Sequence, residues 1–358
     1  MAGDIPSTHQ SKCTDFQNAS FLRGTNLRVQ FLLFTLSDPS CGQLVEENTD
    51  LQNSGFNVTL GTKLLIHGFS VIVLGVSESS IHIIGVSLGA HVGGMVGHFY
   101  KGQLGRITGL DPAGPEYTRA SLEERLDAGD ALFVEAIHTD TDNLGIRIPV
   151  GHVDYFVNGG QDQPGCPTFI HAGYSYLICD HMRAVHLYIS ALENPCPLMA
   201  FPCASYKDFL AGQCLDCLNP FLLSCPRIGL LEQGGVKIEP LPKEVRVYLL
   251  TTSRDPYCVQ FFIDVQLIDS NYNNQLPKQQ LRGKGIIAHP QPQCQINQVK
   301  LKLQASNRVW RKDRTTIVGK FCTAPLPVND SKKMVCLPQP VTLQASVTVF
   351  HDLKIACV

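Results

Sequence analysis

The sequence lacks a large excess of charge of either sign, because 29 Lys and Arg stand against 31 Asp and Glu, a net charge of -2. This balance gives no electrostatic basis for binding nucleic acid, and no basic run marks a membrane-binding arm. The chain also has no run approaching the ~18 apolar residues needed to span a bilayer, so we expect no transmembrane segment. Residues 1–10 contain no apolar core, so no signal peptide is visible.

Cysteine is abundant by comparison, with 14 residues of this type. So many thiols are not typical of a reducing cytosol, and the clustering of four of them in residues 203–225 is typical of a disulfide-stapled loop region. Glycosylation sequons at Asn18, Asn57 and Asn329 point to the same oxidising compartment. We therefore expect a secreted, extracellular glycoprotein, although no signal peptide is visible.

The most informative stretch joins a buried strand to a tight turn. Residues 81–84 are Ile-His-Ile-Ile, residues 85–89 are Gly-Val-Ser-Leu-Gly, and the small residues that follow are typical of a helix. A strand, Gly-x-Ser-x-Gly and a helix in this order form a nucleophile elbow, in which the glycines make room for an exposed serine. The five-residue pattern alone also occurs by chance in loops. With its flanking elements it predicts Ser87 as a nucleophile that attacks an acyl carbonyl.

The rest of the chain divides into two parts. Strand-like segments alternate with loops and a helix up to about residue 240, which predicts an α/β fold. Beyond residue 236, short alternating runs such as 246–250 and 341–349 are separated by turns, which predicts a β-sandwich. We expect one domain over residues 1–240 and a second over residues 241–358.

A serine hydroxyl needs a histidine to take its proton and a carboxylate to orient that histidine. Asp111 follows a strand-like segment in a loop held rigid by prolines, and it suits the order Ser, Asp, His of α/β-hydrolases. An aspartate before a proline is also an ordinary turn residue. Asp111 is therefore a candidate acid with an alternative interpretation.

Several downstream histidines are candidates for the base. His181 lies just after Cys179 and opens a helical stretch, so its imidazole could reach over the sheet. His138 ends a strand and is the alternative. The others suit a helix surface or a polar loop: His152, His171 and His186.

An oxyanion hole needs two backbone N–H groups near the nucleophile. The first is expected from Leu88, the residue after the serine, and the second from a loop that follows an earlier strand. Phe69, in the segment His67-Gly68-Phe69, is the candidate for the second. A plain turn is the other interpretation of this segment.

Five motifs that follow one another along the chain resemble those of a known protein family. The chain contains Ile-His-Gly-Phe at 66–69, the elbow at 85–91, Gly-Leu-Asp-Pro-Ala-Gly-Pro at 109–115, Val-Glu-Ala-Ile-His-Thr-Asp at 134–140 and Cys-Asp-His-Met-Arg at 179–183. The series resembles the pancreatic lipase family of secreted triacylglycerol lipases and phospholipases over nearly the whole chain. The resemblance implies Ser87 as nucleophile, Asp111 as acid and His181 as base. It assigns His138 to a strand-end motif.

The resemblance also implies a lid loop bounded by a disulfide between Cys166 and Cys179. Such a short lid goes with phospholipase A1 activity in this family, and it would leave the site open to a substrate with a polar head group. Two further disulfides are implied, Cys203–Cys214 and Cys217–Cys225. The C-terminal β-sandwich resembles the lipid-associating domain of these lipases.

No cofactor is expected for catalysis, but the resemblance implies a structural calcium ion. Asp127 and Asp130 match a calcium loop of related lipases, and oxygen ligands at this spacing suit calcium. A merely solvated acidic surface is the other interpretation of this acidic stretch.

One departure from the family lies between Phe69 and Gly85. Only residues 70–80 separate two expected parallel strands, fewer than a crossover with a helix needs. A strand ending in Asp-Trp, with flanking helices, is absent from this interval, and the single tryptophan is Trp310. We therefore expect a shortened α/β-hydrolase fold in which the two strands on either side of the gap still pair.

Together with the elbow, the resemblance implies a phospholipase A1 that hydrolyses the sn-1 acyl ester of glycerophospholipids through an acyl-enzyme. The resemblance also implies phosphatidylserine and lysophosphatidylserine as substrates, met at a membrane or lipoprotein surface. A catalytically impaired relative that only binds lipid or protein is the first alternative, because the sheet is shortened. A carboxylesterase of small soluble esters is the second.

Overall fold

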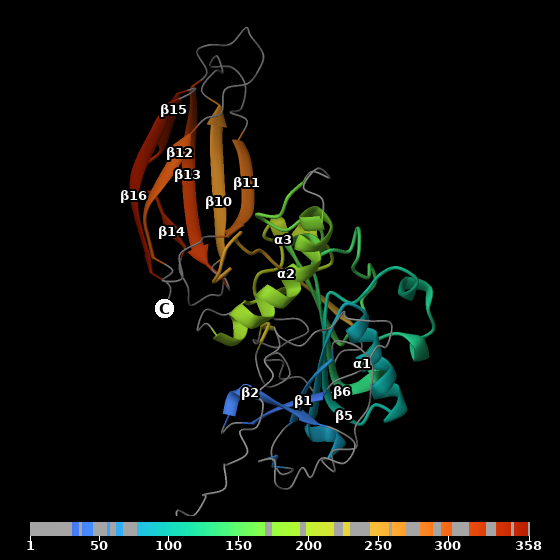
Figure 1. Cartoon of the computed structure of the whole chain (residues 1–358). Helices are drawn as coiled ribbons and strands as arrows, with labels where there is room; N and C mark the ends of the chain where they lie inside the picture. Colours follow the sequence, from blue (N-terminus) through green and yellow to red (C-terminus); the bar gives the residue numbers. More distant parts are fainter. Residues whose placement is uncertain are drawn as a thin grey trace, which may run out of the picture.

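The chain is described from a computed structural model, and all structural statements concern the residues that it describes. These are residues 31–35, 38–45, 56–57, 62–66, 77–168, 174–193, 198–217, 225–229, 244–257, 260–269, 280–288, 295–302, 315–326, 334–344 and 347–356. Figure 1 shows a mixed sheet with its helices and, beside it, the C-terminal strands. None of the described helices is both long and apolar enough to cross a membrane.

The central sheet has the strand order β3-β4-β5-β6-β7-β9-β8. Neighbouring strands are parallel except for β8, which is antiparallel to β9. Strands of this kind are covered on both faces, which explains the long apolar runs of β4 to β7. The strands are β3 (Thr62–Ile66), β4 (Ile81–Val86), β5 (Leu104–Leu110), β6 (Ala131–His138), β7 (Val153–Val157), β8 (Phe201–Pro202) and β9 (Val245–Leu249).

The two longer helices cover opposite faces of this sheet. Helix α1 (Leu88–Phe99) packs on the cluster that contains Ile83, and helix α2 (Tyr174–Glu193) packs on the cluster that contains Ile84. Consecutive residues of a strand point to opposite faces, so the two clusters are separated by the sheet itself. A short helix, α3, comprises Tyr206–Leu210. The 3-10 helices are η2 (Glu78–Ser80), η3 (Tyr117–Arg119), η4 (Leu122–Glu124), η5 (Ala128–Asp130) and η6 (Asn158–Gly160).

The two strands on either side of the short interval pair as expected. Strand β3 is parallel to β4, in a register that runs from Thr62 opposite Ile81 to Ile66 opposite Gly85. Strands β1 (Phe31–Thr35) and β2 (Asp38–Val45) form a separate antiparallel hairpin. β3 is therefore the last strand on its side of the described sheet.

The C-terminal strands form two antiparallel sheets. One has the order β11-β10-β13-β14 with β15 also paired to β13, and the other is β12-β16. Residues from both sheets, among them Phe321 and Leu353, form a common core, so the arrangement is a β-sandwich. The strands are β10 (Gln260–Asp269), β11 (Gln280–Ala288), β12 (Gln295–Lys302), β13 (Thr315–Pro325), β14 (Val335–Cys336), β15 (Val341–Gln344) and β16 (Thr348–Ala356).

The pairing of β9 changes the domain division expected from the sequence. Residues 246–250 were assigned to the second domain, yet Val245 to Leu249 pair with β7 in the central sheet. A β-branched alternating run fits a parallel strand as well as a sandwich strand, and only the long-range partner distinguishes the two. By this pairing the first domain extends beyond residue 240. Phe262 of β10 packs in one cluster with Phe209 of α3, which joins the two parts.

The expected disulfides Cys166–Cys179, Cys203–Cys214 and Cys217–Cys225 are confirmed. A further disulfide, Cys322–Cys336, joins β13 to β14. Of the glycosylation sequons, Asn57 is exposed, while Asn18 and Asn329 lie outside the described residues.

Candidate active site

The elbow between β4 and α1 has the backbone that its sequence predicts. Ser87 takes φ 56° and ψ -120°, a positive φ that residues with a side chain rarely adopt. Gly85 is buried against the following turn, where a Cβ atom would collide with the backbone of Gly89 and Ala90. Only glycine fits there, which explains the small residue two positions before the serine.

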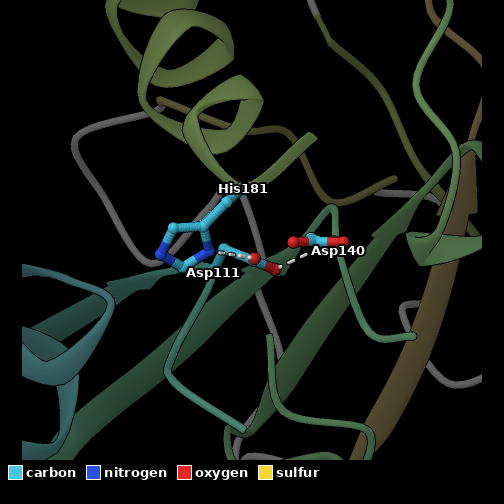
Figure 2. A group of neighbouring side chains, drawn as sticks. All are labelled: Asp111, Asp140 and His181. Carbon is cyan, nitrogen blue, oxygen red and sulfur yellow. Dashed lines mark hydrogen bonds and ion pairs between the residues drawn. The ribbon is translucent and has the colours of Figure 1, made fainter. Parts of the chain in front are cut away.

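Asp111 follows β5 and is completely buried. Its Oδ1 accepts hydrogen bonds from the backbone N–H groups of Thr139, at 2.8 Å, and Asp140, at 3.2 Å. Its Oδ2 lies 2.6 Å from Nδ1 of His181 (Figure 2). Three N–H donors therefore hold the carboxylate in one orientation.

His181 lies in α2 and is only 4% exposed. Since Asp111 is the partner of Nδ1, the proton belongs on Nδ1, and Nε2 keeps the lone pair that a general base needs. The sequence analysis expected a helix to open at His181, whereas α2 begins at Tyr174. No glycine or proline interrupts residues 174–193, so nothing in this stretch stops the helix from starting earlier.

Ser87 is tied to the Asp111 loop through the backbone. Val86 and Leu110 are paired in the parallel strands β4 and β5, so Ser87 and Asp111 are the next residues on neighbouring strands. The Ser87 N–H donates to the Leu110 carbonyl at 3.0 Å, and the Ala113 N–H donates to the Ser87 carbonyl at 3.2 Å. The structure thus joins Asp111 to His181 by side chains and Ser87 to the same loop by the main chain.

The other candidate bases have different environments. His138 is fully buried, with Nε2 2.8 Å from an Asp154 carboxylate oxygen and Nδ1 3.2 Å from the Ile146 carbonyl oxygen. Both ring nitrogens are therefore occupied. Nδ1 of His152 accepts the Val134 N–H, His186 is exposed on α2, and His171 lies outside the described residues.

Only one of the two expected oxyanion donors is described. Leu88 is the first residue of α1, and the first N–H groups of a helix have no carbonyl partner within the helix. Leu88 is 57% exposed beside Ser87. Phe69 lies outside the described residues, so its role stays a prediction.

Asp140 is a site residue that the sequence analysis did not single out. One ligand atom of each of Asp111, Asp140 and His181 lies within 4.8 Å of the others. Burial raises the pKa of Asp140, and the charge of Asp111 raises it further, while hydrogen bonds from Asn143 and Leu144 oppose this change. Its place two residues after the end of β6 was the available signal, because the carboxyl ends of parallel strands share one edge of the sheet.

The carboxylates expected to bind calcium already have partners. The Asp127 side chain accepts the Gly129 N–H, and the Asp130 side chain accepts the Asp127 N–H, so the two form a reciprocal cap on η5. Among the described residues no third acidic or histidine ligand joins them within reach. Calcium takes six to eight oxygens. The two carboxylates therefore do not by themselves fit a calcium site, and calcium stays a prediction.

Comparisons with known proteins identify the family of the chain. A protein-family model described as "Lipase" matches residues 1–74 and 72–257. "Phospholipase A1 member A" of Homo sapiens is 67% identical over 100% of this chain and 95% of its own, and that of Mus musculus is 66% identical with the same coverage. "Lipase member H" of Danio rerio is 39% identical over 72% of this chain and 71% of its own.

The comparisons also locate the expected gap. The two matched stretches of the family model meet at residues 72–74, between Phe69 and Gly85. The alignment with the human relative runs over 433 residues, whereas the chain has 358, so that relative has residues with no counterpart here. The family model matches more than half of the chain, including all of the motifs described above. The chain therefore belongs to the pancreatic lipase family, as its motifs predicted.

Proposed function

We propose that the chain is a phospholipase A1 of shortened α/β-hydrolase fold, a serine esterase that hydrolyses the sn-1 acyl ester of glycerophospholipids. The observation that carries the proposal is the buried contact of 2.6 Å between Asp111 and His181, beside the elbow that holds Ser87. The relatives named phospholipase A1, with 66–67% identity over the whole chain, support the substrate class.

Each residue has one role in the proposed reaction. The Ser87 oxygen attacks the sn-1 carbonyl carbon while Nε2 of His181 takes the hydroxyl proton. Asp111 holds the histidine and stabilises the positive charge that forms on it. The N–H of Leu88 is one donor to the negatively charged carbonyl oxygen, and Phe69 is the proposed second.

The leaving and hydrolysis steps use the same groups. The carbon–oxygen bond to the glycerol breaks, and the His181 proton moves to that oxygen, so that lysophospholipid leaves and the fatty acyl group stays on Ser87. A water molecule then gives a proton to His181 and its hydroxide to the acyl carbon. The fatty acid leaves and Ser87 regains its proton.

The setting of the reaction is part of the proposal. The chain would be secreted, and it would act at a membrane or lipoprotein surface without crossing it, with the C-terminal β-sandwich associating with lipid. Phosphatidylserine and lysophosphatidylserine are the proposed substrates. The loop closed by Cys166–Cys179 is proposed as a lid, because the disulfide anchors it two residues before His181.

Labelling with a fluorophosphonate tests the proposal, since this reagent reacts far faster with an activated serine than with an ordinary one. We expect the folded chain to be labelled stoichiometrically, Ser87→Ala to remain unlabelled, and Ser77→Ala to be labelled like the wild type, because Ser77 is exposed outside the site. Release of sn-1 fatty acid from phospholipid vesicles should follow the labelling. A folded wild-type chain that takes no label would refute the proposal.

The second candidate function is a non-catalytic lipid- or protein-binding relative. It is favoured by one observation, the residues of the relatives that have no counterpart in this chain. Vesicle binding without labelling or fatty acid release would support it. A small-ester carboxylesterase would instead hydrolyse short soluble esters as well as or better than vesicles.

A further inference from the structure

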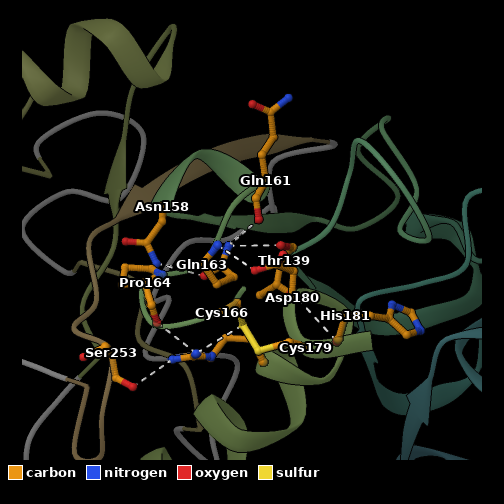
Figure 3. Close-up of a disulfide and its surroundings, with 11 residues drawn as sticks. Thr139, Asn158, Gln161, Gln163, Pro164, Cys166, Cys179, Asp180, His181 and Ser253 are labelled. Carbon is orange, nitrogen blue, oxygen red and sulfur yellow. Dashed lines mark hydrogen bonds between the residues drawn. A yellow bond between two sulfur atoms is a disulfide. The ribbon is translucent and has the colours of Figure 1, made fainter. Parts of the chain in front are cut away.

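Gln163 is a buried amide at the root of the disulfide-closed loop. Only 3% of this residue is exposed, and it lies between η6 and Cys166. Its Nε2 donates to the carbonyl oxygens of Thr139 and Gln161 at 3.0 Å (Figure 3), and to that of Val157 at 2.9 Å. One side chain therefore joins the end of β6, the end of β7 and the loop that leads to the disulfide.

The contacts of Gln163 reach both members of the Asp111–His181 pair. It binds the carbonyl of Thr139, the residue whose N–H donates to Asp111 Oδ1 at 2.8 Å. Its own backbone N–H donates to Oδ1 of Asp180, the residue before His181, at 2.7 Å. Gln163 is thus linked to the Asp111 carboxylate through one residue, Thr139, and to His181 through one residue, Asp180.

The amide of Gln163 is held in one orientation. Asn158 Nδ2 donates to its Oε1 at 2.8 Å, and Asn158 is itself bound to Thr251 through both a side-chain and a backbone hydrogen bond. A reversed amide would place Oε1 against three carbonyl oxygens. Neither an apolar nor an acidic side chain could replace these bonds, because the position needs a donor and an acceptor together.

The same residue is linked to the disulfide. The Cys166 N–H donates to the Gln163 carbonyl at 3.0 Å, and Cys179 precedes Asp180. Arg183 of α2 also binds this segment, because its guanidinium donates to the Pro164 carbonyl at 2.9 Å. Hydrogen bonds therefore connect three parts of the chain: the segment before Cys166, Asp180 next to His181, and Thr139, which binds Asp111.

From this network we infer that Gln163 is a positioning residue that sets the geometry of Asp111 against His181. The inference rests on the proposed function, because it assigns a part in the same reaction. Gln163 touches no reacting atom. It acts through Thr139 on one side and Asp180 on the other, and a displacement of about 1 Å in such a pair can lower a rate about a hundredfold.

The test compares Gln163→Met with Gln213→Met, the same substitution at an exposed glutamine outside this network. For each chain, active sites are counted by titration with a fluorophosphonate, and kcat and KM per titrated site are measured on phosphatidylserine vesicles as a function of pH. Thermal unfolding of each variant is recorded in parallel.

For Gln163→Met we expect kcat per titrated site to fall about 10- to 100-fold, with KM within about twofold of the wild type. The acid limb of its kcat profile should move to lower pH, because a displaced Asp111 stabilises the imidazolium less. Gln213→Met should match the wild type. If Gln163→Met is not secreted in folded form, Gln163→Asn is used with the same readouts, since it keeps a donor and an acceptor on a side chain that is one methylene shorter.

The inference alone is overturned by a wild-type kcat per titrated site with an unshifted acid limb. This holds also where the number of titratable sites falls, because a loss confined to that number indicates a purely structural role. A wild-type chain without labelling or turnover overturns the proposed function, and this inference with it. The two failures are therefore distinguished by the wild-type arm.

Discussion

Replacement of Asp111 by asparagine tests the assignment of the acid most directly. The new amide keeps an oxygen that can accept the N–H groups of Thr139 and Asp140, so it should hold the orientation of the carboxylate. Its NH₂ group then faces Nδ1 of His181. That nitrogen must become an acceptor, the ring proton moves to Nε2, and the base towards Ser87 is lost.

The expected size of the effect follows from this tautomer change. The same substitution in a Ser-His-Asp triad lowers kcat about 10⁴-fold, which corresponds to about 5.5 kcal/mol of activation free energy. We expect a loss of this order in sn-1 fatty acid release by Asp111→Asn, with a parallel fall in the rate of fluorophosphonate labelling. Thermal unfolding should change little, since the two backbone hydrogen bonds remain and the one to His181 is kept with its direction reversed.

Asp140→Asn is the matched control, because this second buried carboxylate lies beside the same pair. Asn143 and Leu144 donate to the Asp140 side chain, and an amide oxygen can still accept from either of them. We expect a loss below about tenfold, since the substitution leaves the tautomer of His181 unchanged. The reverse ranking, with Asp140→Asn the more damaging, would refute the assignment of Asp111 as the acid.

Three further changes have definite expected outcomes. Burial raises the pKa of Asp180 to about 6, so its contribution to the free energy of unfolding is full below the unfolded pKa of ~3.9 and is lost as the pH rises through about 6. Asp180→Asn should therefore raise the unfolding temperature more at about pH 8 than at about pH 4.5. Gly85→Ala should abolish both secretion and labelling, because its Cβ would collide with the backbone of the next turn. Replacing Cys166 and Cys179 by serine removes a closed loop with a sequence separation of 13, so we expect the free energy of unfolding to fall by about 3 kcal/mol in denaturant titrations.

The elbow was predictable because its geometry is local. Gly85 and the positive φ of Ser87 belong to one tight turn, and five consecutive residues determine the steric requirements of that turn. The contact between Asp111 and His181 is of another kind, since 70 positions separate them in sequence. Residue chemistry favoured His181 but left His138 as an alternative base, and the ordered motifs of the family strengthened the choice of His181.

The features missed by the sequence analysis depend on long-range packing. Strand β7 contains Asp154, a residue unusual in a buried strand, and its carboxylate is tolerated because His138 and backbone N–H groups bind it. Strand β9 was assigned to the sandwich because its pairing with β7 is invisible in its own pattern. Gln163 looks like an ordinary loop residue until the fold brings Thr139 and Asp180 to it.

The short interval follows β3, the last strand on its side of the described sheet, whereas the described candidate residues follow other strands. Ser87 follows β4, Asp111 follows β5, and both Asp140 and the network of Gln163 follow β6 and β7. β3 pairs with β4 in a regular register, so the elbow strand is flanked on both sides. Of the residues proposed for the reaction, only Phe69 lies in the segment between β3 and β4, three positions after the end of β3. One missing oxyanion donor lowers kcat by about 10²- to 10³-fold. The short interval therefore bears on the stabilisation of the oxyanion, whereas the acid, the base and the elbow have supports of their own.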